Sequence, residues 1–320
     1  MIGLIFNGNA GKTKIGKVEK KKLERILNSN GVVRESANKS GLIEIIREFK
    51  ESNVDKIVLV GGDGTLHYAT NCLANIYDNK MPLIIPLNGG TTNVISKSID
   101  CGENPTRTLQ AIIECEKNNI NIKTIDIYPI YVTNAENKIN VYSFIFGQGA
   151  VWKFMEEYYD SPGEPTPWKA TKLFLKAAVD SRYREEFFNC DELAAIVPRN
   201  KSFKGSNYEV CNILFASSVK AVIKTLGFRL DPFNVLESGG MYLGYCNFKP
   251  SIGNFFSLVW NATNGREING VKYHNNVDEF YVQSTNEGNN FAADGEMIEA
   301  KSNLIKVRRA DFSFRFATEI

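Results

Sequence analysis

The stretch Lys56-Ile-Val-Leu-Val-Gly-Gly-Asp-Gly-Thr65 decides the fold of the first part of this chain. Its apolar run is typical of a strand buried on both faces, and an apolar helical pattern follows at residues 65–77. Three glycines within four residues leave the backbone open to a bound phosphate. A helix that starts there presents N–H groups and a partial positive charge. The stretch therefore predicts a strand, an anion-binding turn and a helix, although a purely structural tight turn with an N-cap would use the same residues.

A second stretch repeats this arrangement. Residues 83–87 read as another buried strand, and Pro86-Leu-Asn-Gly-Gly-Thr-Thr-Asn93 then opens a helix over residues 92–99. Parallel strands end at the same edge of a sheet, and ligands of open α/β sheets bind at that edge. Two glycine-rich loops side by side at one edge are harder to explain as coincidence than either loop alone.

The first strand, residues 2–6, also ends in a glycine-bearing loop, residues 7–11. Gly11-Lys12-Thr13 resembles the end of a Walker A loop, which needs a glycine five positions before Gly11. Phe6 stands there, so the motif fails. The loop is then either an ordinary strand–helix turn or a further wall of a ligand site at the sheet edge.

The order of the patterns predicts two domains. Residues 1–121 alternate strands with helices at 18–27, 42–49, 65–77, 92–99 and 106–117, which favours an α/β domain with a parallel sheet. Residues 122–320 carry alternating, aromatic-rich segments at 123–132, 140–146, 193–197, 209–215, 240–245 and 278–284, which favour an antiparallel β-sandwich. A helix is expected at 168–181, the role of the segment 152–188 stays open, and the last strand is allowed to return to the first domain.

Composition narrows the classes of function. The formal net charge of +2 does not fit a nucleic-acid-binding protein, whose footprint would be a strongly basic domain. No run of about 18 apolar residues and no signal-like start are visible. Six scattered cysteines fit reduced core thiols, so we expect a cytoplasmic protein. Because the sequence has only two histidines, we expect neither a zinc site nor a Ser-His-Asp catalytic triad.

A late motif, Asp294-Gly295-Glu296, has two meanings. By itself, Asp-Gly indicates a tight hairpin turn. In company with the glycine loops, its two carboxylates become candidates for acid–base or metal chemistry.

Together these motifs resemble the diacylglycerol kinase catalytic family, which includes soluble bacterial diacylglycerol kinases and sphingosine kinase-like lipid kinases. The shared features are an Asn-led loop after the first strand, GGDGT, a Pro-to-Asn segment and a late DGE, here residues 7–12, 61–65, 86–93 and 294–296. The resemblance implies an NAD kinase/diacylglycerol kinase-like nucleotide domain and a β-rich lipid-substrate domain, with ATP and Mg²⁺ held in the cleft between them.

The resemblance also implies roles for individual residues. Phosphates would be cradled by Gly61, Gly62, Gly64 and Thr65, and the rest of the nucleotide site would be lined by Asn7, Lys12, Gly90, Thr91, Thr92 and Asn93. Asp63 would hold magnesium through water. Asp294 would act as general base on the lipid hydroxyl, and Glu296 would support the base or the metal.

The chain departs from the family pattern at several positions. Lys97 replaces an arginine and loses its bidentate fork, Tyr68 replaces a glutamate, and the third motif has one extra residue. Residues 238–243 lack the acidic turn that the soluble bacterial enzymes link to a structural magnesium ion. We therefore expect this second metal site to be absent, and the acceptor stays open among diacylglycerol, a sphingoid base, ceramide and monoacylglycerol.

The sequence thus predicts an ATP-dependent lipid kinase that contacts membrane surfaces transiently as a peripheral protein and binds no nucleic acid. One alternative is an NAD kinase-like enzyme with a soluble acceptor, although the Asn-Glu pair expected after GGDGT is missing. Another is a non-catalytic nucleotide or lipid sensor, against which the intact carboxylates of Asp63, Asp294 and Glu296 argue. An exposed sheet edge in the second domain would permit a homodimer.

Overall fold

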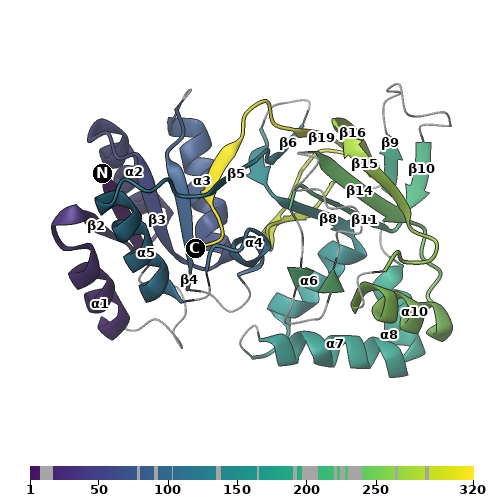
Figure 1. Cartoon of the computed structure of the whole chain (residues 1–320). Helices are drawn as coiled ribbons and strands as arrows, with labels where there is room; N and C mark the ends of the chain where they lie inside the picture. Colours follow the sequence, from purple (N-terminus) through teal and green to yellow (C-terminus); the bar gives the residue numbers. More distant parts are fainter. Residues whose placement is uncertain are drawn as a thin grey trace. The chain divides into compact units, whose positions relative to one another are not determined.

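The chain forms two compact units in the computed structural model (Figure 1). One consists of Met1–Ile127 together with Phe312–Ile320, and the other of Tyr128–Asp311. The structure describes residues 1–7, 17–77, 80–89, 93–102, 104–134, 138–163, 166–189, 193–196, 208–219, 222–223, 228–229, 240–263, 266–284 and 288–320.

The first unit is built on a six-stranded sheet in the order β2-β1-β3-β4-β20-β5. These strands are β1 (Ile2–Asn7), β2 (Gly31–Ser36), β3 (Lys56–Gly61), β4 (Leu83–Asn88), β5 (Thr124–Ile127) and β20 (Phe314–Ala317). All neighbours are parallel except β20 and β5, which are antiparallel. The predicted α/β domain with a mostly parallel sheet is confirmed.

Helices pack onto this sheet through the faces that the sequence pattern indicates. They are α1 (Lys17–Leu27), α2 (Lys39–Glu51), α3 (Asp63–Ile76), α4 (Val94–Ser98) and α5 (Pro105–Lys117), with a short 3-10 turn, η1, at Asn28–Asn30. In α2 the buried residues are Leu42, Ile45, Ile46 and Phe49, which lie on one face. Asn38 caps this helix by accepting from the Gly41 amide at 2.9 Å. Local capping and apolar spacing therefore agree with the position of the helix.

The second unit is an antiparallel β-sandwich, as predicted. One six-stranded sheet has the order β10 (Tyr208–Cys211), β9 (Leu193–Ile196), β16 (Glu279–Ser284), β19 (Leu304–Arg309), β6 (Ile130–Asn134) and β7 (Asn140–Ser143). The other has β15 (Lys272–Val277), β14 (Met241–Cys246), β11 (Ile213–Ser217), β8 (Ile145–Gly149), β17 (Phe291–Ala293) and β18 (Glu296–Ile298). A small pair joins β12 (Val222–Ile223) to β13 (Phe228–Arg229). The two large sheets share one core, in which the rings of Phe146 and Phe280 meet at 6.1 Å.

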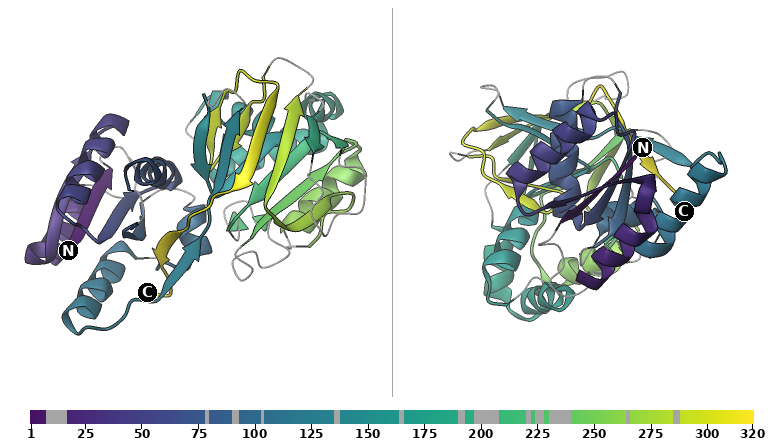
Figure 2. Two further views of the ribbon diagram at one scale, coloured as in Figure 1. Left: turned by 90° about the horizontal axis from the view of Figure 1, so that it is seen from above. Right: turned by 90° about the vertical axis from the view of Figure 1, so that its left-hand side faces the viewer.

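Helices cover the outer face of the sheet that contains β11 and β14 (Figure 2). They are α6 (Ala150–Asp160), α7 (Pro167–Val179), α8 (Ser181–Phe188) and α10 (Ile252–Thr263). Phe188 of α8 and Phe255 of α10 belong to the same buried cluster as Tyr242 of β14. The expected helix 168–181 corresponds to α7, which ends at Val179. The next residue, Asp180, is the N-cap of α8, and its side chain accepts from the Tyr183 amide.

The predicted segment 123–132 is two strands rather than one. β5 belongs to the first unit and β6 to the second, and Tyr128 and Pro129 separate them. Pro129 has no N–H to donate to a β-ladder. Its carbonyl accepts from the amide of Ala310, which lies between β19 and β20, at 2.8 Å. The alternating pattern runs across both strands and therefore does not indicate the point at which the chain changes sheets.

None of the helices in the part of the chain that the structure describes is both long enough and apolar enough to cross a bilayer.

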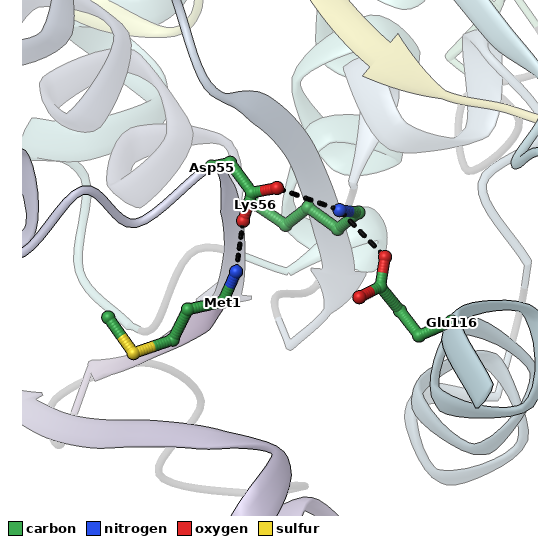
Figure 3. Close-up of polar contacts among 4 residues, drawn as sticks. All are labelled: Met1, Asp55, Lys56 and Glu116. Atoms are coloured by element: carbon green, nitrogen blue, oxygen red, sulfur yellow. Dashed lines mark hydrogen bonds and ion pairs between the residues drawn. The ribbon is translucent and has the colours of Figure 1, made fainter. Parts of the chain in front are cut away.

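An ionic chain links the starts of β1 and β3 to the end of α5 (Figure 3). The Met1 ammonium donates to Asp55, whose other oxygen accepts from Lys56 Nζ at 3.0 Å; Lys56 also donates to Glu116 at 2.7 Å. Burial opposes ionisation of Asp55, but the hydrogen bonds from the ammonium and Lys56 outweigh it and hold the pKa of this carboxyl below its usual value. Burial likewise opposes the charge of Lys56, and its bonds to Glu116 and Asp55 raise its pKa instead.

We predict that Lys56→Met lowers the free energy of unfolding by about 1 kcal/mol near neutral pH, because it removes two ion pairs around a side chain that is only 17% exposed. Because the pKa of Asp55 is depressed in the folded state, its contribution is present above the unfolded value of about 3.9 and is lost as pH falls further. Urea unfolding from about pH 7 to about pH 3 should therefore show the difference shrink.

Lys123→Met is the matched control. It breaks a pair with Glu319 in which both side chains are more than half exposed, so the loss of stability should be smaller. If the Lys56 variant is no less stable than the Lys123 variant, the predicted contribution of the Lys56 ion pairs to stability is wrong.

Candidate phosphate-binding site and late acidic turn

The start of α3 is the centre of the candidate site in the first unit. Gly61 is the last residue of β3, and Gly62 is the N-cap of α3, with extended backbone angles φ −96° and ψ −173°. Asp63, Gly64 and Thr65 form the first helical turn. Gly62 has no side chain with which to cap the helix, so the N-terminal amides of α3 begin at a glycine, as in an anion-binding turn.

Thr65 folds back onto the end of β3 and leaves no room for a side chain at position 61. A Cβ on Gly61 would lie 2.4 Å from Thr65 Oγ1 and 2.5 Å from its Cβ. The Thr65 hydroxyl in turn accepts from Asn7 Nδ2 at 2.7 Å. β1 is thus fixed to β3 and α3, which follow it far along the chain, at the carboxyl edge of the sheet.

The second glycine-rich loop joins the same edge. The Gly89 amide donates to the Gly61 carbonyl at 2.9 Å, which extends the pairing of β3 with β4. Asp63 Oδ1 accepts from the Ile95 amide at 3.3 Å, so the first turn of α3 is bonded to the first turn of α4. The expectation that both loops lie side by side is met by these contacts.

Asn93 and Asn88 shape the second loop. Asn93, the N-cap of α4, is buried and adopts the left-handed conformation with φ 49°. Asn88 accepts from the Ser96 hydroxyl at 2.5 Å and donates to the Gly102 carbonyl at 2.9 Å. The sequence pattern indicates no role for Asn88 or Ser96, because they meet only when the loop is folded.

A small hollow lies at this edge. Its lining includes Gly61, Gly62, Asp63, Thr65, Pro86, Leu87, Asn93 and Ser96. Lys12, Gly90, Thr91 and Thr92, which the sequence also assigns to the nucleotide site, lie outside the described residues.

The described side chains at the hollow are too few to hold a metal ion by themselves. Among the residues that the structure describes, no group of three or more His, Cys, Asp or Glu side chains could hold a metal by itself. Asp63 contributes a single carboxylate to the hollow. Mg²⁺ commonly binds through one or two carboxylates, several waters and substrate phosphates, so this donor set fits magnesium that arrives with a nucleotide.

In the second unit, Asp294 and Gly295 form the two-residue turn between β17 and β18. Both have positive φ, 53° and 91°, which is the type I′ geometry that an Asp-Gly dipeptide favours. The hairpin expected from the dipeptide is therefore present.

The Asp294 carboxylate is fixed inside this unit. The side chain is buried, and its Oδ1 accepts from the Phe144 amide at 2.8 Å and from the Ile145 amide at 2.9 Å. The Asp294 amide donates back to the Ile145 carbonyl at 2.9 Å. Asp294 thus clamps the start of β8 to the β17–β18 turn, a structural duty that is independent of any catalytic one.

Glu296 and α6 complete the surroundings of the turn. Glu296 begins β18, pairs with Ala293 and is partly exposed. On α6, Tyr159 donates its hydroxyl to the Gly295 carbonyl at 3.1 Å, and Met155 also approaches this glycine. The aromatic segment whose role the sequence left open therefore includes a helix that packs against the acidic turn.

Comparison with known proteins agrees with this geometry. Residues 1–125 match the family model described as the diacylglycerol kinase catalytic domain. The resemblance inferred from the motifs is confirmed for this part of the chain, and the match supports a kinase. No curated protein matches the sequence.

Solved structures show how far the shared fold extends. A diacylglycerol kinase from Bacillus anthracis aligns with a TM-score of 0.65 at 13% identity, covering 99% of this chain and 96% of that chain. A second candidate diacylglycerol kinase from the same organism aligns with a TM-score of 0.71 at 15% identity, covering 99% and 97%. An NAD kinase from Archaeoglobus fulgidus in complex with ATP aligns at 0.51 and 12% identity, covering 99% and 94%. At these identities the likeness concerns the fold alone.

We predict that Gly61→Ala destabilises the protein by about 1–3 kcal/mol, because the added methyl group would overlap Thr65 and force the first turn of α3 to move. The cost should fall in a Thr65→Gly background, in which the overlapping atoms are gone. A thermal or urea unfolding cycle of the four proteins measures this coupling.

Gly253→Ala is the control, since a Cβ at this helical position meets no heavy atom within 4 Å. It should leave stability unchanged or raise it slightly. Equal effects at positions 61 and 253 would refute the close contact.

Proposed function

We propose that this protein is an ATP-dependent kinase that transfers the γ-phosphoryl group of ATP to a hydroxyl of a lipid. The observation that carries the proposal is the joined start of α3 and α4, where Asp63 binds the Ile95 amide beside a glycine-bounded hollow. The family match of residues 1–125 supports the same reaction class. Phosphoryl transfer depends mainly on positioning and charge neutralisation, which such a turn can supply.

In this proposal the N-terminal turn of α3 binds ATP phosphates. Gly61, Gly62 and Gly64 let the phosphates approach the backbone, and Thr65, held by Asn7, offers its hydroxyl. Asn93, together with Lys12 and residues 90–92, would contribute to the rest of the nucleotide site. Mg²⁺, when bound with the nucleotide, neutralises phosphate charge, and Asp63 would orient it through water.

Asp294 is the proposed general base. The lipid hydroxyl oxygen forms a bond to the γ-phosphorus, the bond from that phosphorus to the ADP oxygen breaks, and the hydroxyl proton passes to the Asp294 carboxylate. The turn already fixes Oδ1 through two backbone amides, so the carboxylate is oriented before any substrate binds. Glu296, the first residue of β18, would support the base or the metal.

A soluble acceptor is the second candidate. The fold likeness to the Archaeoglobus fulgidus NAD kinase favours it, because the name of that protein gives a soluble dinucleotide as its acceptor. The two proposals differ only in the acceptor and share the nucleotide site.

The first test incubates purified protein with γ-labelled ATP, magnesium and a panel of diacylglycerol, sphingoid base, ceramide and monoacylglycerol, with NAD as soluble acceptor. We expect label in one organic-extractable lipid. Asp294→Asn should lower the rate by about 10²–10⁴-fold, because an amide cannot take the proton.

The Asn variant is chosen because its amide oxygen still accepts the Phe144 and Ile145 N–H groups, so the turn is kept. Asp294→Ala loses those bonds as well and should also be less stable, by about 1–3 kcal/mol. Full turnover by the Asn variant would eliminate the base role. Label in NAD alone would move the function to a soluble acceptor, and ATP binding without any transfer would leave a sensor.

A second test concerns Asp63. Asp63→Asn keeps an oxygen acceptor for the Ile95 amide but removes the negative charge. We expect the variant to need a higher Mg²⁺ concentration for half-maximal rate while its affinity for magnesium-free ATP is unchanged or tighter, since a repulsive charge is gone. An unchanged magnesium dependence would exclude the proposed metal role.

A further inference from the structure

The second unit carries a cluster of exposed apolar side chains on α7 and α10. Each is more than half exposed, a state that large apolar residues reach singly but seldom in groups. The members are Trp168, Leu175 and Val179 on α7, and Ile252, Phe256 and Trp260 on α10.

The exposed residues form one stripe on each helix. At 100° per residue, Trp168, Leu175, Val179 and Lys172 fall within about 60° of one another around α7. Ile252, Phe256 and Trp260 follow one another at four-residue spacing and fall within about 80° around α10. Other faces of both helices are buried, for example at Ala170 and Ala177 of α7, opposite its stripe, and at Phe255 of α10, about 100° from the centre of its stripe. Each helix is thus anchored by one apolar face and exposes another.

The two helices are neighbours (Figure 1). Phe174 of α7 and Leu258 of α10 pack against the same buried residue, Ile268. The two stripes therefore belong to adjoining elements of one unit.

Charge distinguishes this region from an ordinary protein contact. α7 contains three lysines and no acidic residue, and α10 contains no charged residue. Lys172 and Lys176 are exposed, and Lys172 lies over the Trp168 ring with its Nζ 5.8 Å from the ring centroid. Lys169 is different: it is buried and donates to the Ser161 and Gly163 carbonyls, so it fixes the α6–α7 connection.

A second copy of the chain is a poor occupant for this surface. A two-fold contact brings the same patch of both copies together, so Lys172 and Lys176 of one copy would approach a surface that carries the same positive charges. Neither helix offers an acidic side chain to neutralise them. An anionic lipid surface instead supplies phosphates for the lysines and an apolar boundary for the indole, phenyl and aliphatic groups.

We propose that the exposed faces of α7 and α10 form a docking surface for anionic membranes, with Trp168, Leu175 and Phe256 entering the headgroup–acyl boundary and Lys172 and Lys176 binding lipid phosphates. This surface shares no residue with the phosphate hollow. The inference therefore stands whichever acceptor the protein phosphorylates.

The test is co-flotation of the full chain, without ATP, with phosphatidylcholine vesicles and with vesicles of phosphatidylcholine and phosphatidylglycerol in equal parts. We expect stronger binding to the anionic vesicles. The triple variant Trp168→Ser, Leu175→Ser, Phe256→Ser should lower this binding at least about tenfold. Lys172→Gln and Lys176→Gln should each lower it about fivefold, and only on anionic vesicles.

Matched controls are Ile120→Ser, which removes an equally exposed apolar side chain from the first unit, and Lys301→Gln, an exposed lysine outside both helices. Both should bind vesicles like the unmodified protein. Unchanged melting temperatures establish that the variants fold.

The proposal is overturned if the unmodified protein does not bind anionic vesicles, or if the triple variant binds as well as the Ile120 control. Dimerisation in sedimentation, lost in the triple variant without any vesicle binding, would assign the surface to a second copy instead. Vesicle binding by a protein that phosphorylates no lipid would defeat the proposed function and leave this inference standing.

Discussion

The crowded contact between Gly61 and Thr65 is the constraint on which the first unit's site depends. A strand that ends in glycine allows the first turn of α3 to fold back against it, and Asn7 then bonds the Thr65 hydroxyl from the neighbouring strand. The Gly89–Gly61 and Ile95–Asp63 hydrogen bonds add the next strand and helix to the same edge. These contacts hold the loops together at one edge of the sheet, and the contact with Thr65 requires that position 61 has no side chain.

In the second unit, Asp294 has a structural role in the β17–β18 turn that also bears on its proposed chemistry. Its left-handed backbone and its two amide bonds account for an Asp-Gly pair at this turn without reference to any reaction. The same bonds orient the carboxylate, and this orientation suits the proposed role of Asp294 as a general base. This is why the Asp294→Asn substitution is more informative than removal of the side chain.

Local patterns predicted much of this molecule and missed what depends on long-range pairing. The buried strands at 56–61 and 83–88 and the helix containing Phe49 are visible as apolar runs or helical spacing. β2 escapes because it lies at the edge of its sheet, where partial burial leaves no continuous apolar run. α10 escapes because it has no charged residue, and its apolar residues occupy exposed as well as buried positions, so the apolar face is unusually wide. In the site, the residue types were readable, but the Asn88–Ser96 bond and the anchoring of Asp294 at Phe144 required the folded chain.

The position of β20 has a consequence for how the protein is made. This strand, Phe314–Ala317, lies between β4 and β5, and the Thr318 amide bonds the Lys123 carbonyl beyond it. During synthesis, the sheet that ends at Gly61 and Asn88 has an open edge at β4 until residues 314–317 have left the ribosome. An unpaired edge of a parallel sheet is prone to pair with other chains. The N-terminal unit is therefore completed last, although its sequence emerges first, and the β-sandwich has the opportunity to fold before it.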